Sequence, residues 1–525
     1  MKSIMKFLLL IIMLGATAAL AQKPPQFEHV IVIFQENRST DNMFGSNPTF
    51  ESGVDIITPN DPRISCHGTQ QQMTSVPLAY CYDLDHWFAS WQAMCNLDPK
   101  SGACKMDGAC DVGYTPSSTC KVQGYPEYRY VDNSAHVIDP YFAIAKNYSF
   151  ANYMFQTNEG PSMPAHQFIL SGTSAPVPPN DKSGLGTWFV SDDPWGFSNL
   201  GCTAPKGDGI ALADPSGQGG STKTCYKKPK GDHCFGPPCY HHNTLGTVLD
   251  AANLTWRYFT PAVPGSPPII NAPLSSKDLC DPVKGVCKGT DYLTKVVVGN
   301  PAVIFNDMGL GPKKTCNLPN VTWLIPDFRW SDHPLQGNSW GPSWVADVID
   351  AVAGYDNQGN QINNCGYWDN TAIIVTWDDW GGWYDHVAPQ VIRDGKSWGS
   401  GYVYGFRVPM MVVSKYTPAG TISGPCNSDG TCTNNVPPHI HDFGSILRFI
   451  ENNWGLGYVN PDPPYYADGN ASDDNPSKGY YALGDFFSSQ ARSFTLIPAP
   501  ANQNYTFFQA QGGSFAPDDD DEGPQ

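Results

Sequence analysis

At 525 residues, the chain is long enough for two to four average domains, or for one enlarged α/β domain with long excursions. Hydrophobic residues make up 41% of it and charged residues 15%, with 51 Gly and 47 Pro, a composition typical of an ordered, loop-rich globular protein. The formal net charge of −18 excludes a general affinity for nucleic acid or for anionic lipid surfaces, apart from a local basic patch or a bound cation.

The N-terminus has the three parts of an export signal. Lys2 and Lys6 precede the apolar run "FLLLIIMLG" at 7–15, and the small residues of "ATAALAQ" follow it. We predict a signal peptide at 1–21 that is cleaved after Ala21. The apolar run is too short to span a bilayer, and no later stretch is long and apolar enough to do so. We therefore expect a secreted or periplasmic chain with no integral membrane segment.

All 16 cysteines follow residue 60. An even number in an exported chain indicates disulfides, and the close spacings lack the CxxC pattern of a zinc knuckle. We expect local disulfide-stapled loops, although spacing leaves the pairing open. The closely spaced cysteines are Cys104 and Cys110, Cys234 and Cys239, Cys280 and Cys287, and Cys426 and Cys432.

Three short apolar stretches predict the central strands of an α/β sheet. They are "HVIVIFQEN" at 29–37, "VTWLIPDFRWSDHP" at 321–334 and "NTAIIVTWDDWGGWYDH" at 370–386. Ligands bind beyond the carboxyl ends of the strands in open sheets of this type. This rule places three polar pairs at one edge of the sheet: Glu36 with Asn37, Asp332 with His333, and Asp378 with Asp379.

Two helical segments lie between the first and second strands. The stretch "DPYFAIAKNYSFANYMF" at 139–155 is a candidate helix, and a second helical pattern begins after Gly160. Ser162 stands where an N-cap is expected, with Pro164 in the first turn. A hydroxyl there would face an anion held by exposed backbone N–H groups, although a plain capping serine is the commoner case.

The remaining segments complete the expected organisation. Residues 182–313 are rich in Gly, Pro, Cys and Lys, and we predict a loop-rich insertion or lid there. A further strand is expected within "VYGFRVPMMVVSKYTP" at 403–418, and an amphipathic helix ending at Gly455 within 442–457. The acidic run at 518–522 is typical of a solvated, disordered tail, with calcium binding as the less common alternative.

The polar residues at the strand ends suit metal-assisted chemistry. Glu36, Asp378 and Asp379 supply hard oxygen ligands and Asn37 adds an amide, which together predict one divalent metal ion of unknown identity. Such an ion could lower the pKa of the Ser162 hydroxyl, and His333 could protonate a leaving group. Each feature also has a plain structural explanation, since adjacent acids usually form a solvated loop and a Glu-Asn pair can cap a helix.

Seven sequence blocks strengthen the interpretation that these residues form one functional site. The blocks are "HVIVIFQENRSTDNMFG", "YDLDHWFASW", "EGPSMPAHQFILSGT", "IPDFRWSDHP", "TWDDWGGWYDHVAP", "GFRVPMMVVS" and "SILRFIE". In this order, from about His29 to Gly457, the chain resembles the phosphoesterase family that contains bacterial phospholipases C and acid phosphatases. The resemblance implies a fold similar to the alkaline phosphatase superfamily, with three layers and a largely parallel central sheet. We accordingly expect a catalytic domain at 22–495 and a tail at 496–525.

The resemblance also implies roles for particular residues. Glu36, Asn37, Asp378 and Asp379 match the positions that surround a metal, and Ser162 matches the nucleophile, where many phospholipase relatives carry threonine. His333 matches a histidine that contacts the phosphoryl group, and His86 matches another histidine near the site. Two positions depart from the family pattern: Asp379 stands where glutamate is frequent, and Phe443 stands where relatives often have histidine.

These features predict a phosphoric ester hydrolase that forms a phosphoseryl intermediate on Ser162. Ser162 favours acid phosphatase-like action on phosphomonoesters, with phospholipase C-like cleavage of phosphodiesters as the alternative. A sulfatase-like enzyme is disfavoured because no CxPxR-type motif surrounds Ser162. A secreted glycan-binding protein is suggested by 15 Trp and 25 Tyr, but it would not need the serine and the acids together. The oligomeric state stays open.

Overall fold

The computed structural model describes residues 23–512 apart from 102, 118–119, 179–180, 183–187, 194–200, 206–207, 214–233, 263–268, 336, 390–403, 428–430, 433–436 and 461–465. The predicted signal peptide at 1–21 and the acidic run at 518–522 lie outside the described residues.

A six-stranded sheet forms the centre of the fold, in the order β15-β12-β16-β1-β17-β18. All neighbouring strands in it are parallel except β17 and β18, which pair antiparallel. The strands are β1 His29–Gln35, β12 Trp256–Thr260, β15 Val296–Val298, β16 Val321–Leu324, β17 Thr371–Trp377 and β18 Met410–Ser414. The four strands predicted from the sequence are therefore confirmed.

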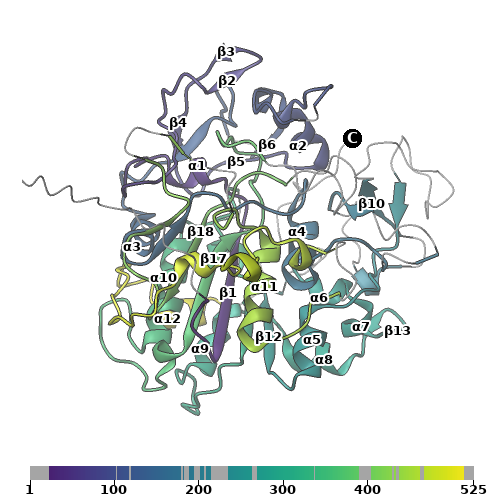
Figure 1. Ribbon diagram of the computed structural model, residues 1–525, viewed down its shortest axis with the longest axis vertical. Coiled ribbons are helices and arrows are strands. Elements are labelled where there is room, and N and C mark those ends of the chain that lie inside the picture. Colours follow the sequence, from purple (N-terminus) through teal and green to yellow (C-terminus); the bar gives the residue numbers. More distant parts are fainter. Residues whose placement is uncertain are drawn as a thin grey trace, which may run out of the picture.

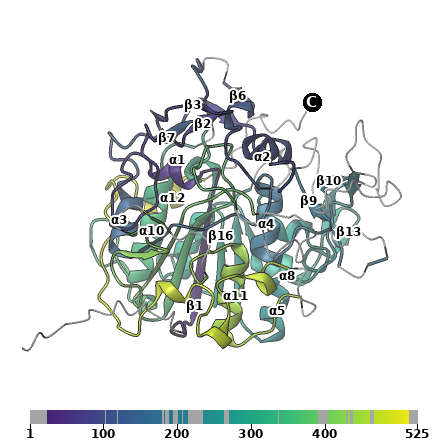
Figure 2. The same ribbon diagram turned by 45° about the horizontal axis from the view of Figure 1, so that its top comes forward.

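Helices cover both faces of this sheet (Figures 1 and 2), with α3 Asp139–Asn147 and α10 Gly341–Ala353 on one side and α4 Ser162–Ser171 and α11 Phe443–Trp454 on the other. The side chains of β1 alternate between these layers. Phe34 packs edge-on against Phe443 of α11 with ring centroids 5.1 Å apart, whereas Gln35 donates a hydrogen bond to Tyr141 of α3. The expected three-layer α/β architecture is confirmed.

Local sequence explains where the main helices end. Asp442 caps α11 in a capping box with Ser445, and Gly455 ends it in the left-handed conformation at φ 66°, as the sequence predicts. The helix expected over 139–155 is shorter than predicted. It ends at Asn147, and the strand β8 Ser149–Ala151 follows because the chain turns there to pair with β19 Thr421–Ser423.

The segment 182–313 is more than an insertion. It supplies β12 and β15 of the central sheet and the helix α5 Leu245–Ala251. The apolar residues of β12 pair with β16 in the core, so the prediction of a lid over the whole segment is too wide. The short elements β9 Phe189–Val190, β10 Ile210–Ala213 and β11 Cys234–Gly236 form a separate three-stranded sheet, at the right of Figures 1 and 2.

The predicted tail at 496–525 also contains structured residues. The helix α12 Tyr505–Ala510 packs beside α10, and the fully buried ring of Phe508 lies 5.3 Å from that of Trp330 and 5.4 Å from that of Trp344. Burial of an aromatic side chain there means that 505–510 belongs to the folded unit. The tail prediction is therefore wrong for this part.

Residues between β1 and α3 form a cap of short elements over the sheet. Figures 1 and 2 show β2, β3 and α2 at the top of the molecule. The elements are α1 Thr40–Phe44, β2 Ser65–Cys66, β3 Thr69–Gln70, β4 Thr74–Val76, β5 Tyr82–Leu84, α2 Phe88–Cys95, β6 Tyr114–Pro116 and β7 Arg129–Val131.

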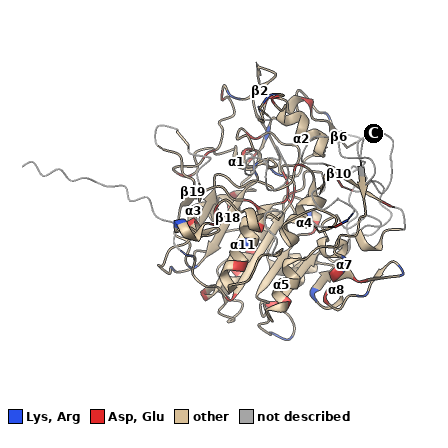
Figure 3. Cartoon of the chain, turned by 45° about the vertical axis from the view of Figure 1, so that its right-hand side comes forward, with Lys and Arg blue, Asp and Glu red and all other residues tan. Residues whose placement is uncertain are grey.

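Short elements also surround β12 and β15 along the chain. They are α6 Ala272–Ser275, α7 Lys277–Cys280, β13 Pro282–Val283, β14 Val286–Cys287, α8 Thr290–Lys295 and α9 Ile304–Asp307. Figure 3 shows the charged residues scattered over helices and loops, with most of the ribbon uncharged. This distribution agrees with a charged fraction of 15%.

Seven disulfides join cysteines within the described residues. Three close short loops and four connect cysteines 37 to 49 positions apart. The pairs are Cys66–Cys110, Cys81–Cys120, Cys95–Cys104, Cys202–Cys239, Cys280–Cys287, Cys316–Cys365 and Cys426–Cys432. Among the helices that the structure describes, none has both the length and the apolar character needed to cross a membrane.

Candidate active site

The register of two strands brings two acids together. Gln35 at the end of β1 is paired with Trp377 at the end of β17, so the next residues, Glu36 and Asp378, leave the sheet side by side. The backbone N–H of Asn37 donates to Oδ1 of Asp378 at 3.0 Å and fixes the two loops to each other. The strand ends therefore position these groups, as the sequence predicts.

Asn37 has the left-handed backbone conformation, at φ 57°. Asparagine tolerates this region better than most residues, because its short polar side chain bonds locally. The loop after β17 approaches very closely here. A Cβ on Gly381 would lie 2.4 Å from the carbonyl oxygen of Asn37, so only glycine fits.

The side-chain amide of Asn37 is oriented by His86. His86 Nδ1 lies 2.6 Å from the carbonyl oxygen of Leu84, which requires that this nitrogen carries the proton. His86 Nε2 is then an acceptor for the Asn37 amide nitrogen, 3.3 Å away. The amide oxygen of Asn37 is buried and has no hydrogen-bond partner, so it is available to a ligand. The structure thus brings His86 to the predicted site through Asn37.

Ser162 is the first residue of α4, and Pro161 is the N-cap. The prediction that Ser162 caps the helix is wrong, because its hydroxyl bonds to a distant residue instead of to its own backbone. Ser162 Oγ donates to Oδ2 of Asp379 at 3.2 Å, while Asp379 Oδ1 accepts from the N–H of Gly381. The hydroxyl of Ser162 therefore points toward the acids at the sheet edge.

His166, one turn further along α4, joins the same group and was not predicted from the sequence. Its Nε2 lies 3.6 Å from Glu36 Oε1 and 3.6 Å from Asp378 Oδ2, and its Nδ1 lies 3.2 Å from the hydroxyl of Tyr258. Residues four apart share one face of a helix, so the spacing from Ser162 was the available signal. A histidine at this spacing has many structural uses, and the spacing alone does not identify a site.

Glu36, His166 and Asp378 form a donor set that fits a cation. One ligand atom from each lies within 4.8 Å of the others, and all three side chains are almost fully buried. Both carboxylate oxygens of Glu36, Oδ2 of Asp378 and Nε2 of His166 have no hydrogen-bond partner. Buried polar atoms are rarely left unpaired, so these atoms favour a bound divalent ion. Asp379 lies outside this set, since its oxygens bond to Ser162 and Gly381.

Three buried carboxylates, those of Glu36, Asp378 and Asp379, dominate the electrostatics of the site. Burial, together with the charge of Asp378, raises the pKa of Glu36, and burial raises the pKa of Asp379. Burial also acts to raise the pKa of Asp378, but its contact with His166 outweighs this and lowers the pKa. No Lys or Arg in the described part of the chain forms an ion pair with Glu36, Asp378 or Asp379.

Asp332 and His333 follow the short 3-10 helix Phe328–Trp330 that comes after β16, and they face different ways. His333 Nε2 lies 3.5 Å from Oδ2 of Asp83, which comes from the cap over the sheet. Asp332 instead turns back toward the helices: its Oδ2 accepts from Tyr141 at 2.6 Å and from Trp377 at 3.2 Å. Burial raises the pKa of Asp332 to about 6, and its bonds to Tyr141 and Trp377 make it a structural carboxylate.

A second buried cluster supports both acidic loops. Arg407 bonds to Asp41 at 3.1 Å and to Asp385 at 3.0 Å, and His386 bonds to Asp41 at 2.7 Å. Arg407 and protonated His386 together balance the charges of Asp41 and Asp385, so the cluster does not need a metal. His386 lies between Asp41 and Asp55 and is a structural residue of this cluster.

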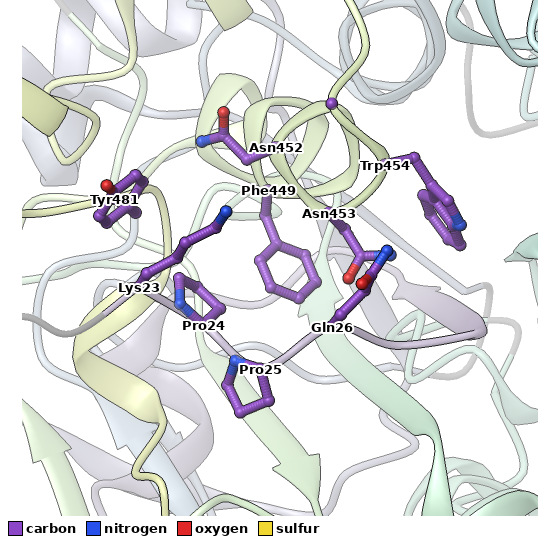
Figure 4. A pocket seen from close by; sticks show the side chains of 10 residues that line it. Lys23, Pro24, Pro25, Gln26, Phe449, Asn452, Asn453, Trp454 and Tyr481 are labelled. Atoms are coloured by element: carbon purple, nitrogen blue, oxygen red, sulfur yellow. The ribbon is translucent and has the colours of Figure 1, made fainter.

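A pocket of about 420 Å³ lies at the opposite edge of the sheet, between 23–26 and the end of α11 (Figure 4). Asn453 of α11 holds this segment in place by bonding to the backbone of Phe27, just before β1 begins. Phe449, Trp454 and Tyr481 also line the pocket. Because β1 carries Glu36 at its other end, this pocket is separate from the acidic site.

A model of the Phosphoesterase family matches residues 27–457. The chain belongs to the Phosphoesterase family. All the residues placed at the acidic site, from Glu36 to Asp379, fall within the matched part. The sequence-based resemblance is therefore confirmed.

Proteins similar to this chain include two from Pseudomonas aeruginosa. The chain is 23% identical over 488 residues to a non-hemolytic phospholipase C, covering 83% of this chain and 55% of that protein. It is also 23% identical over 462 residues to a hemolytic phospholipase C, covering 83% and 54%. The chain thus spans about half the length of the curated relatives that it matches.

Similar solved structures include the lipoteichoic acid synthase LtaP from Listeria monocytogenes. It is 9% identical, with 86% of this chain and 77% of that chain covered and a TM-score of 0.32. A likeness of this size carries no argument about the Phosphoesterase site.

Proposed function

We propose that this protein hydrolyses phosphoric esters with Ser162 as the nucleophile. The observation that carries the proposal is the hydrogen bond from Ser162 Oγ to Asp379 Oδ2 at 3.2 Å. It lies next to carboxylate oxygens of Glu36 and Asp378 that have no hydrogen-bond partner and could ligate a metal. A serine hydroxyl aimed at a buried carboxylate beside a cation site is the arrangement that nucleophilic catalysis requires. A binding protein without turnover would not need this arrangement.

Glu36, Asp378 and His166 would hold one divalent ion, with the amide oxygen of Asn37 as a further ligand or a contact to the phosphoryl group. The ion would neutralise phosphoryl charge and favour the ionised form of the Ser162 hydroxyl. His86 keeps the oxygen of the Asn37 amide directed to the site. This proposed set keeps Glu36, Asn37 and Asp378 of the four ligands expected from the sequence. Asp379 is instead proposed to interact with the nucleophile Ser162.

The proposed reaction has two displacements at phosphorus. In the first, Ser162 Oγ forms a bond to phosphorus while its proton passes to Asp379, and the bond to the ester oxygen breaks. His333, held by Asp83, donates a proton to the departing oxygen. In the second, a water molecule attacks the phosphoseryl group and passes a proton to His333, while the proton on Asp379 returns to Ser162 Oγ as its bond to phosphorus breaks and the phosphorylated product leaves.

For the substrate we propose a phosphodiester, as in phospholipase C. Support comes from the names of the relatives, both of which are phospholipases C. The second candidate is acid phosphatase-like hydrolysis of a phosphomonoester, which Ser162 favours, since many phospholipase relatives have threonine there. We also propose that the chain is exported, and the seven disulfides support an oxidising compartment.

Purified protein offered paired chromogenic substrates tests this proposal. We expect turnover of nitrophenyl phosphorylcholine that exceeds turnover of nitrophenyl phosphate, and loss of both activities in Ser162→Ala. Ser171→Ala is the matched control, because Ser171 is a buried serine at the other end of α4. Preference for the monoester would favour the second candidate. No turnover of either ester would reject phosphoric ester hydrolysis.

A further inference from the structure

A further acid, Asp193, lies at the beginning of the nucleophile helix. Its Oδ1 accepts a 2.8 Å hydrogen bond from the backbone N–H of Met163, the residue after Ser162. Asp193 lies 30 positions after Met163 in the sequence, and only 2% of its surface is exposed. Neither the sequence motifs nor the proposed mechanism gives it a role.

The position of Asp193 matters because α4 has few free donors at its start. Its first three residues are Ser162, Met163 and Pro164, and proline has no backbone N–H. With Met163 already bonded to Asp193, the N–H of Ser162 is the one backbone donor of this turn that bonds to no residue in the described part of the chain. A carboxylate therefore takes one of the donors that helix starts normally offer to phosphate.

Asp193 also adds negative charge to a site that already contains Glu36, Asp378 and Asp379. Asp193 bonds to the residue after the nucleophile, so its charge lies beside the position that a phosphoryl group on Ser162 would occupy. One divalent cation would balance only part of this charge. A phosphoryl group with two negative charges is repelled more strongly here than one with a single charge.

We propose that Asp193 is a specificity-determining residue that disfavours dianionic phosphomonoesters and thereby favours phosphodiesters of single negative charge, including those with a cationic head group. This inference rests on the proposed function and specifies the charge of the substrate that the enzyme prefers. It assigns to Asp193 a role through charge and not through proton transfer.

The test compares Asp193→Asn with wild type on two esters that share one leaving group, nitrophenyl phosphate and bis(nitrophenyl) phosphate. Asparagine keeps an oxygen that accepts from Met163, so the variant removes the charge and retains the helix contact. Asp192→Asn is the matched control, because Asp192 is also buried but bonds to Phe88 and Ser191. Circular dichroism and the melting temperature establish that each variant is folded.

We expect Asp193→Asn to raise kcat/KM for the monoester relative to the diester about tenfold at about pH 7.5. The gain shrinks at about pH 5, because a phosphomonoester takes up its second proton near pH 6 and then carries a single charge. Asp192→Asn leaves the ratio unchanged.

Two results would overturn the inference: a ratio that does not change in Asp193→Asn, or the same change at both pH values. If Asp193→Asn does not fold, Asp193→Glu keeps the charge and must keep the wild-type ratio; a changed ratio then rejects the charge mechanism. Absence of turnover by the wild type would instead reject the proposed function.

Discussion

Ser162 Oγ donates a hydrogen bond to Asp379 Oδ2 at 3.2 Å, although the two residues stand 217 positions apart. The acidic site around these two residues has two parts, a group of metal-ligand atoms and a carboxylate that contacts the nucleophile. Glu36, His166 and Asp378 carry the unpaired donor atoms that suit a cation, whereas Asp379 is bonded to the nucleophile. The adjacent aspartates are therefore expected to differ in function.

Asp379→Asn and Asp378→Asn test this division. We expect Asp379→Asn to retain the metal but to lose at least about 100-fold in kcat, because the amide cannot take the proton of Ser162. Asp378→Asn loses both metal and activity, because it removes a ligand charge. Metal content by elemental analysis and single-turnover rates give the two readouts. Loss of metal in Asp379→Asn, or unchanged metal in Asp378→Asn, would show that the assignment is wrong.

His166→Ala tests the ligand that the sequence motifs did not predict. We expect at least about a tenfold loss of divalent-ion affinity by calorimetric titration of chelator-treated protein, since one of the donor atoms is removed. His29→Gln is the matched control, because His29 lies at the other end of β1 and bonds to the backbone of Pro319. Equal affinity in His166→Ala and wild type would exclude His166 from the cation site.

A buried ion-pair cluster predicts a pH-dependent stability. His441 is fully buried and lies 2.7 Å from Asp473 and 3.6 Å from Asp485. Burial lowers the pKa of His441, but Asp485 and Asp473 outweigh it and raise the pKa from 6.5 to about 10. Because the folded state holds this proton more tightly, the stabilisation is complete below pH 6.5 and is lost as the pH rises through about 10.

We therefore expect His441→Gln to lower the free energy of unfolding by about 3 kcal/mol at about pH 6. The difference from wild type narrows toward about pH 10, where wild-type His441 loses its proton. Chemical denaturation at several pH values measures it. A difference that is constant over this range would contradict the assigned charge state of His441.

Disulfides of different loop length should contribute unequally to stability. Cys316–Cys365 spans 49 positions and Cys280–Cys287 spans 7. The chain-entropy model gives about 4 kcal/mol for the longer loop and about 2 kcal/mol for the shorter one. Urea denaturation of the two double Cys→Ser variants measures these losses. A larger loss for the short loop would show that native-state contacts, and not loop entropy, dominate.

The sequence predicted the strand ends well because short apolar runs define buried strands and parallel strands share one edge. Glu36 and Asp378 were placed together on that basis, and the register of β1 with β17 agrees. The N-cap role of Ser162 was predicted wrongly because the partner of its hydroxyl, Asp379, lies far along the chain. Local sequence cannot reveal such a partner.

Other errors have the same origin. The strand β12 is only five residues long within a loop-rich segment, and only its pairing with β16 shows that it belongs to the core. The contact from Asp193 to Met163 joins residues 30 positions apart and has no sequence signal. Disulfide pairing, similarly, follows from the fold and not from cysteine spacing.

Trapping the covalent intermediate tests the role of Ser162 as the nucleophile. Wild-type protein is mixed with a nitrophenyl phosphodiester, quenched rapidly in acid, digested and analysed by mass spectrometry, with Ser162→Ala and Ser171→Ala treated in parallel. We expect one phosphoryl-containing adduct on Ser162 in the wild type and in Ser171→Ala, and none in Ser162→Ala. An adduct on another residue, or full turnover by Ser162→Ala, would contradict the assignment of Ser162 as the nucleophile.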